Sequence, residues 1–336
     1  MIGSLQAWRF IFALMIFHHH FFIEPQVVQF GFFPVAFFFI LSGYVMAMGY
    51  ENKVDGPSFS YLSFIKKRLI RIYPLHLFCL ILALILPVVS FIDLKSYILA
   101  LPELFLVQAW LPIKGLYSLN PVSWYLSSLL LVYLFFPFLM RWLKGQYGWY
   151  TTILILIVYF VVMPFIGDEW VNYLIYVSPY FRIIDFILGM MLYLGMKANI
   201  SENHRPVSAT ILEIIAIACA VASLIFYPYV PEKISMASLF WIPSLLLISA
   251  FVISAKWGGA VSYLLDKPFF VYLGSLSFPI YMIHYTIRVW WRLIADRFGM
   301  EKESILGAII CLSITMVLAY QFNSKIEPLV KRKFYH

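Results

Sequence analysis

Long apolar segments follow one another along almost the whole chain, and short polar stretches separate them. Each segment is close to the roughly 20 residues that an α-helix needs to cross the hydrocarbon core of a bilayer. Backbone groups in that core must bond within the segment, which favours helices. We therefore predict an all-α fold, a polytopic integral membrane helical bundle with about ten transmembrane helices. The predicted spans are 5–24, 31–50, 74–92, 122–140, 149–166, 179–196, 207–227, 235–254, 274–295 and 304–322.

The composition agrees with this fold class. Of the 336 residues, 63% are hydrophobic and 12% are charged, and the mean hydropathy is +0.89, values typical of a polytopic membrane protein. We expect residues 1–336 to form a single transmembrane domain, because the longest polar stretch covers only residues 51–60. The segment 97–111 is a candidate re-entrant or interfacial piece or an extra span, and 258–270 is predicted to be a short interfacial helix. Nucleic-acid binding is not expected, because the basic residues lie between spans instead of forming one patch.

The distribution of lysine and arginine predicts the orientation. Cytoplasmic loops of membrane proteins carry an excess of these residues. Most basic residues outside the spans fall on one side of the ten-span arrangement, with Lys66, Arg141 and Lys331 as examples. We therefore expect both termini to be cytoplasmic and the protein to be a multi-pass protein of the cell (inner or plasma) membrane. Arg9 is then near the inner face and His20 lies beyond the middle of the bilayer.

The first span contains one arginine, Arg9, and three consecutive histidines, His18, His19 and His20. Eleven residues at about 100° each make roughly three turns, so Arg9 and His20 share a helix face about 16 Å apart. His18 falls on the opposite face, and His19 lies roughly 80° from Arg9 around the helix axis. Ionisable groups in a membrane helix are costly and indicate function. The alternative is that the histidines only cap the outer end of the helix.

A basic cluster, Lys66, Lys67, Arg68 and Arg71, precedes the third span. Arg68 and Arg71 are three residues apart and therefore neighbours on one helix face. Paired arginines suit phosphate groups, which accept two hydrogen bonds from each guanidinium. The alternative is an ordinary positively charged anchor that is attracted to anionic lipid.

Further charged residues lie inside the apolar runs. Arg182 and Asp185 are three residues apart in the sixth span, and His284 lies in the ninth. Charges in lipid must pair or line a wet cavity, so a polar interior is expected. Arg182 and Asp185 can equally form a purely structural ion pair, and His284 can equally be a packing histidine.

These residues resemble, in order and spacing, the motifs of the membrane-bound acyltransferase-3 family. Arg9 and His20 fit its arginine, ten residues, histidine signature. Five other segments also match family motifs: 37–44, which contains Ser42; 68–74, which contains Tyr73; 124–127, which begins with Trp124; 185–190; and 273–284, which contains Tyr281 and His284. The sequence departs from the family at Leu129 and Leu130, where many members carry a glutamate, and at Asp185, where glutamate is common.

The resemblance implies a stand-alone membrane O-acyltransferase, most often an O-acetyltransferase that acts on surface or secreted glycans. The donor would be cytoplasmic acetyl-CoA or another acyl-CoA, and no metal is expected. His20 would be the general base that deprotonates the acceptor hydroxyl, with Arg9 as the second catalytic residue; an acyl-histidine intermediate is the alternative. Arg68, Arg71 and Tyr73 would bind the CoA. The further candidate site residues are Ser42, Trp124, Arg182, Asp185, Tyr281 and His284.

Two other functions are consistent with charged residues inside the predicted membrane spans. A transporter or flippase of a lipid-linked saccharide also needs many spans and intramembrane charges, although the sequence has no repeats of the kind that many transporters show. A family member that has lost catalysis and only binds acyl-CoA is the third possibility, because Leu129 replaces an acid. Release of CoA in the presence of an acceptor separates the three.

Overall fold

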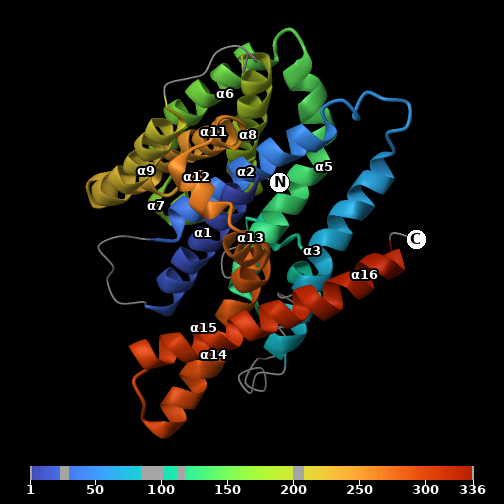
Figure 1. Cartoon of the computed structure of the whole chain (residues 1–336). Coiled ribbons are helices and arrows are strands. Elements are labelled where there is room, and N and C mark those ends of the chain that lie inside the picture. The colour runs from blue at the N-terminus through green and yellow to red at the C-terminus, as the bar shows by residue number, and fades with distance from the viewer. Residues whose placement is uncertain (1, 23–29, 85–100, 113–117, 200–207, 335–336) are drawn as a thin grey trace.

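The computed structural model describes residues 2–22, 30–84, 101–112, 118–199 and 208–334. These residues form helices and turns with no β-strand (Figure 1), so the all-α prediction is confirmed. The longer helices are α1 (Gly3–Phe21), α2 (Phe32–Tyr50), α3 (Tyr61–Leu84), α5 (Trp124–Lys144), α6 (Gly148–Val162), α8 (Pro179–Asn199), α9 (Ala209–Phe226), α11 (Trp241–Trp257), α14 (Ser277–Phe298) and α15 (Ile305–Gln321). The shorter helices are α7 (Asp168–Val171), α10 (Glu232–Ser235), α12 (Ala260–Leu265), α13 (Pro268–Ser275) and α16 (Glu327–Phe334). Single helical turns are η2 (Gln108–Trp110), η3 (Pro121–Ser123), η4 (Met163–Phe165), η5 (Asn172–Val177), η6 (Tyr227–Tyr229), η7 (Ser238–Phe240) and η8 (Phe322–Ile326).

The longer helices correspond one to one to the predicted spans. In the described part of the chain, seven helical stretches are long and apolar enough to cross a membrane. The remaining three of the long helices, α1, α3 and α14, each have at least 19 residues but carry arginine or histidine within their length. The polytopic bundle is therefore confirmed, and these three helices carry Arg9, the basic cluster and His284. The orientation of the termini stays a prediction.

The third span begins earlier than the sequence predicted. We expected 74–92, but α3 runs from Tyr61 to Leu84, and the basic cluster lies inside the helix. Pro74 lies inside this helix. An interior proline removes one backbone hydrogen bond and strains the preceding turn, but a helix can continue through it, and lysine and arginine are good helix formers. Residues 85–92 lie outside the described part.

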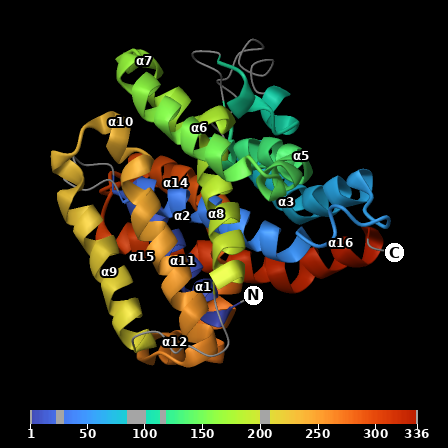
Figure 2. The ribbon, with the colours of Figure 1, turned by 90° about the horizontal axis from the view of Figure 1, so that it is seen from above.

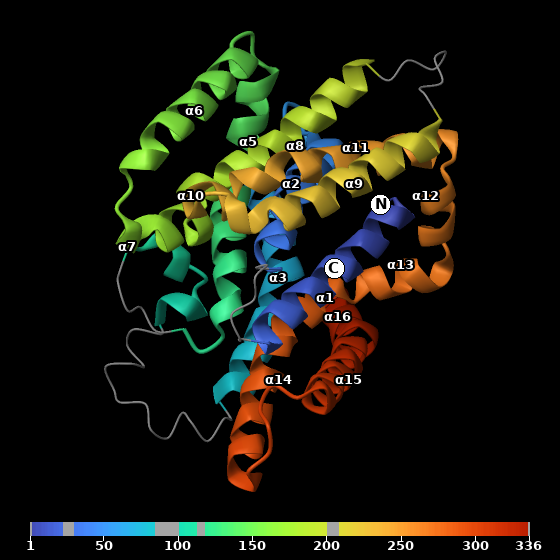
Figure 3. The ribbon, with the colours of Figure 1, turned by 90° about the vertical axis from the view of Figure 1, so that its left-hand side faces the viewer.

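The two short segments also have helical structure. The prediction of a short helix at 258–270 is confirmed by α12 and by the beginning of α13, which follow one another at a sharp corner. Figure 3 shows α12 and α13 bent around the start of α1. The segment 97–111 is described only from residue 101, where a short helical turn leads to η2.

The helix α2 is largely buried and packs against α8, α11 and α1. Gly43 of α2 and Gly189 of α8 mark the closest approach. A Cβ atom on Gly43 would overlap the carbonyl oxygen of Phe186, and one on Gly189 would overlap the carbonyl oxygen of Ile40. These two glycines allow the backbones to touch, as small residues do between membrane helices.

The helices α9 and α3 lie at opposite edges of the bundle, as Figures 1 and 2 both show. The helix α15 continues through η8 into α16, which packs along α3. Between these edges, α1, α2, α3, α5 and α14 come together around one cavity, and this arrangement positions the candidate site.

Candidate active site

Five helices enclose a cavity of about 180 Å³. Most of its wall is apolar, and three arginines supply its charge. The described residues that line it are Arg9, Val35, Phe38, Leu41, Ser42, Val45, Met46, Arg68, Arg71, Ile72, Tyr125, Leu129, Tyr133, Ser277, Phe278 and Tyr281. None of these residues is acidic. A cavity with one charged side and a long apolar wall suits a ligand that has an anionic end and an uncharged arm.

The three arginines are held in place by different contacts. The Nη1 atom of Arg9 donates to the Oε1 atom of Gln6, one turn earlier on α1, at 2.9 Å. Arg68 donates to the hydroxyl of Tyr50 at 3.0 Å and lies over the Tyr50 ring. Arg71 forms an ion pair with Glu327 of α16. The structure thus brings Arg9, Arg68 and Arg71 to one cavity, although Arg9 is far from the other two in the sequence.

A chain of hydrogen bonds runs from His20 to the backbone of α14. The Nδ1 atom of His20 lies 2.9 Å from the Nε2 atom of His284, and the Nδ1 atom of His284 lies 3.1 Å from the carbonyl oxygen of Ile280. A carbonyl only accepts, so the Nδ1 atom of His284 carries a proton. The Nε2 atom of neutral His284 then accepts the bond from the protonated Nδ1 of His20. Consequently, the Nε2 atom of His20 has a lone pair for chemistry.

The other two histidines have different surroundings. His18 is exposed and packs against the rings of Phe22 and Phe30. His19 packs beside Gly31, where an added Cβ would press on the imidazole. Of the three, His20 is the one that bonds to His284, as expected for the histidine that shares a helix face with Arg9.

One buried face of α14 connects the cavity to the histidine pair. Ser277, Tyr281, His284 and Arg288 are separated by four, three and four residues, so they lie on one face. Ser277 and Tyr281 line the cavity, and the Tyr281 hydroxyl donates to the carbonyl of Val122 at 2.6 Å. His284 follows about one turn further along the helix. The cavity and the histidine pair are therefore neighbours along α14.

Arg288 lies one turn beyond His284 and is only 6% exposed. Its guanidinium stacks on Tyr285 at 5.4 Å from the ring centroid, and the His20 ring meets the same Tyr285 ring edge-on. The Nε and Nη2 atoms of Arg288 have no hydrogen-bond acceptor among the described residues. A buried guanidinium with open donors is a place for an anion or for developing negative charge. The spacing of four residues after His284 was the sequence signal for it, but we had not included Arg288 in the predicted site.

The ion pair predicted in α8 lies away from the cavity wall. Arg182 donates to Asp185 at 2.7 Å and also to the carbonyls of Tyr176 and Met236 at 2.7 and 3.1 Å. Trp241 donates to the same Asp185. Both charged residues are almost fully buried. This satisfied network joins α8, α11 and the turns before them.

Two further predicted residues make packing contacts outside the described cavity wall. Trp124 stacks near Tyr176, with ring centroids 4.8 Å apart. Tyr73 donates to the carbonyl of Leu104 at 3.1 Å and so ties α3 to the segment before η2. Their roles in binding stay predictions. Leu129, by contrast, lines the cavity.

Two further buried acids, Glu103 and Glu213, bind backbone N–H groups. Glu103 accepts from the backbone N–H groups of Leu119 and Asn120, and Glu213 accepts from those of Val261 and Ser262. Both satisfy N–H groups at the start of a helical segment. The part of the chain that the structure describes contains no cluster of metal-ligating side chains.

Comparison with known proteins gives two matches. A family model described as an acyltransferase domain matches residues 2–323. The protein named acyltransferase MdmB, from Streptomyces mycarofaciens, is 27% identical over 352 residues, which cover 94% of this chain and 87% of that protein. No solved structure matches the chain significantly.

Proposed function

The chain belongs to the acyltransferase domain family, and from this premise we propose that it is a membrane O-acyltransferase that moves an acyl group from acyl-CoA to a hydroxyl of a glycan. The observation that carries the proposal is the position of His20, bonded to His284 beside a cavity that contains three arginines. The acetyl group is the acyl chain we expect, and a surface polysaccharide or lipid-linked saccharide is the acceptor we expect. The family assignment favours this reading over a transporter or flippase.

Arg68 and Arg71 support an acyl-CoA donor. Their guanidinium groups can bind the diphosphate of CoA through charge-assisted hydrogen bonds. The apolar wall formed by α2 and α5 leaves room for the uncharged pantetheine arm. With both termini in the cytoplasm, as the charge distribution predicts, these arginines would face the compartment in which acyl-CoA is made.

The chemical step follows from the state of His20. Its Nε2 atom takes the proton of the acceptor hydroxyl while the oxygen attacks the thioester carbonyl carbon. The carbon–sulfur bond then breaks, and the CoA thiolate receives the proton from the imidazolium. The products are the acylated acceptor and CoA. The alternative, an acyl group carried on the same Nε2 atom, uses the same lone pair.

His284 and Arg288 support this step from α14. His284 keeps His20 in the tautomer that has its lone pair on Nε2. The positive charge of Arg288 is suited to the negative charge that develops on the thioester carbonyl oxygen.

The test is an assay of the purified protein in lipid nanodiscs with acetyl-CoA and a panel of saccharide acceptors. A thiol reagent follows CoA release, and mass spectrometry detects the new ester. We expect CoA release that depends on the acceptor. If the same protein in sealed proteoliposomes moved a saccharide across the bilayer without CoA release, the proposal would be overturned in favour of a transporter. Tight CoA binding without turnover would make the chain a non-catalytic member.

A further inference from the structure

A second cavity, of about 140 Å³, lies between the end of α2 and the start of α3. Two lysines, Lys53 and Lys67, line it together with the hydroxyls of Ser58, Ser60 and Ser63. None of its described lining residues is acidic. The cavity thus combines positive charge and hydroxyl donors, which are the groups that bind phosphate.

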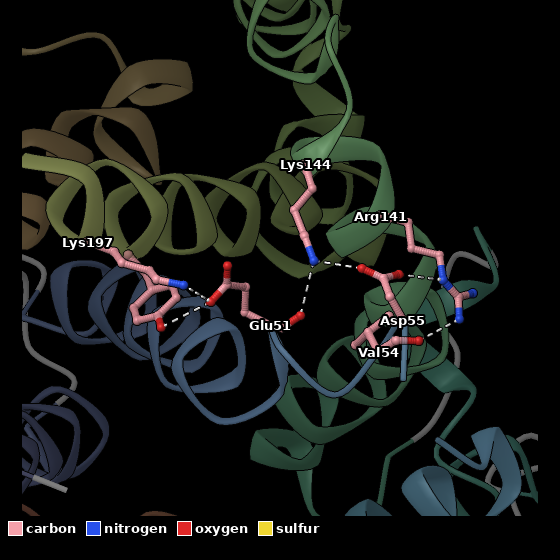
Figure 4. A network of polar contacts seen from close by, with 7 residues as sticks. Glu51, Val54, Asp55, Arg141, Lys144 and Lys197 are labelled. Carbon is pink, nitrogen blue, oxygen red and sulfur yellow. Dashed lines mark hydrogen bonds and ion pairs between the residues drawn. The ribbon is translucent and has the colours of Figure 1, made fainter. Parts of the chain in front are cut away.

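The loop that carries Lys53 is fixed to the bundle by other residues. Figure 4 shows Asp55 between Lys144 and Arg141, at 2.6 and 3.3 Å. The hydrogen bond from Lys144 lowers the pKa of Asp55, so this exposed carboxyl stays ionised at neutral pH. Arg141 also donates to the carbonyl of Val54 at 2.7 Å.

Glu51, the other acid of this loop, is paired as well. It binds Lys197 of α8 at 2.6 Å, on the far side of the same network (Figure 4). The acids near the cavity are therefore neutralised by α5 and α8. Lys53 and Lys67 form no ion pair with any residue that the structure describes, so their charge is available to an anionic ligand.

Aromatic rings form the apolar side of this cavity. Tyr50 and Phe59 both pack on Phe64, with ring centroids 5.0 and 5.9 Å from it. Phe64 is buried beneath the other two, so Tyr50 and Phe59 are the rings that a ligand in the cavity can meet. Aromatic rings stack on nucleobases with little dependence on the base.

Arg68 joins the two cavities. It lines the first cavity, and it donates to the hydroxyl of Tyr50, which lines the second. Lys67, the preceding residue, lines the second cavity. Along this path an acyl-CoA would meet, in order, the apolar wall, the paired arginines, and then lysines with aromatic rings. The parts of acyl-CoA follow one another in the matching order: the uncharged pantetheine arm, the diphosphate and the phosphorylated adenosine.

We propose that the second cavity binds the 3′-phosphoadenosine end of the acyl donor, with the base against the rings of Tyr50 and Phe59 and the 3′-phosphate held by Lys53 and Lys67. This inference rests on the proposed function and deepens it. It makes the protein selective for CoA thioesters over thioesters of carriers that lack the nucleotide.

The experiment compares CoA with dephospho-CoA, which lacks the 3′-phosphate, by calorimetry on the full-length protein in nanodiscs of neutral lipid. We expect the unaltered protein to bind CoA at least tenfold more tightly, because the lost phosphate takes charge-assisted hydrogen bonds with it. In the double variant Lys53→Gln, Lys67→Gln, the two ligands should bind with nearly equal affinity. Lys256→Gln, which changes an exposed lysine elsewhere, should leave the preference intact.

The outcomes separate this inference from the proposed function. Equal binding of CoA and dephospho-CoA by the unaltered protein, or an unchanged preference in the double variant, would overturn the nucleotide site while the donor stays acyl-CoA. Failure of the unaltered protein to bind CoA at all would overturn the proposed donor too.

Discussion

The state of one imidazole decides whether this site can remove a proton. Two hydrogen bonds fix it: one from the Nδ1 atom of His284 to the carbonyl oxygen of Ile280, and one from the Nδ1 atom of His20 to the Nε2 atom of His284. The helical phase of the first span predicted that His20, and not His18, faces the interior. Its bond to His284 could not be predicted, because helical phase orients a residue on its own helix and does not determine which helix packs against it.

The role of His284 can be tested by one substitution that keeps a hydrogen-bond acceptor and one that removes it. In His284→Gln the side-chain oxygen can still accept from the Nδ1 atom of His20, whereas in His284→Leu it cannot. We expect His284→Leu to lower kcat about tenfold to a hundredfold and His284→Gln to retain most of the activity. The KM for acyl-CoA should change little in both. Equal losses in the two variants would show that His284 only packs against its neighbours.

The arginine cavity makes a separate prediction about binding. Arg68→Ala removes charge-assisted hydrogen bonds worth about 1.5–3 kcal/mol, so the KM for acyl-CoA should rise roughly tenfold to a hundredfold. Lys66→Ala is the matched control, because Lys66 is exposed on the same helix and outside the described cavity wall. Steady-state kinetics with purified variants measures the change. An unaltered KM in Arg68→Ala would make the basic cluster a membrane anchor only.

At the scale of elements, the positions of the helices could be predicted well because length and apolar content dominate in a bilayer. The start of α3 could not be predicted, because the first turns of this helix are as basic as a cytoplasmic loop. The convergence of α1, α3 and α14 was also beyond the sequence, since it depends on packing. The contact between α2 and α8 likewise depends on packing. Its glycines, Gly43 and Gly189, stand in the sequence, but the sequence alone does not say which helices meet at them.

That contact predicts a loss of stability. Gly43→Ala or Gly189→Ala would force a methyl group into a backbone carbonyl of the facing helix, and overpacking of this kind costs about 1–3 kcal/mol. Gly49→Ala, in the same helix α2, meets no atom within 4 Å and should be neutral or slightly stabilising, because alanine favours helices. Thermal unfolding in detergent measures the difference. If Gly43→Ala unfolds at the same temperature as Gly49→Ala, the close crossing is wrong.

At the scale of the whole molecule, the proposal needs the arginine cavity to face the cytoplasm. The lysine and arginine distribution predicts that Lys53, Gln146 and Lys256 are cytoplasmic and that Gly167 and Pro231 are outside. Single cysteines at these positions, in a chain whose native Cys79, Cys219 and Cys311 are replaced, should react with an impermeant reagent in intact cells only at the outside positions. Labelling of Lys53→Cys from outside would reverse the orientation and remove acyl-CoA from reach of Arg68.

The central claim is that His20 is the base and that its two neighbours are not. Acyl transfer from acetyl-CoA by purified His18→Ala, His19→Ala and His20→Ala variants at matched abundance tests it most directly. Loss of a positioned base lowers the rate about 10²–10⁴-fold, so we predict such a loss in His20→Ala, most of the activity in His18→Ala, and an intermediate value in His19→Ala. Full activity in His20→Ala, or equal losses in all three variants, would contradict the mechanism.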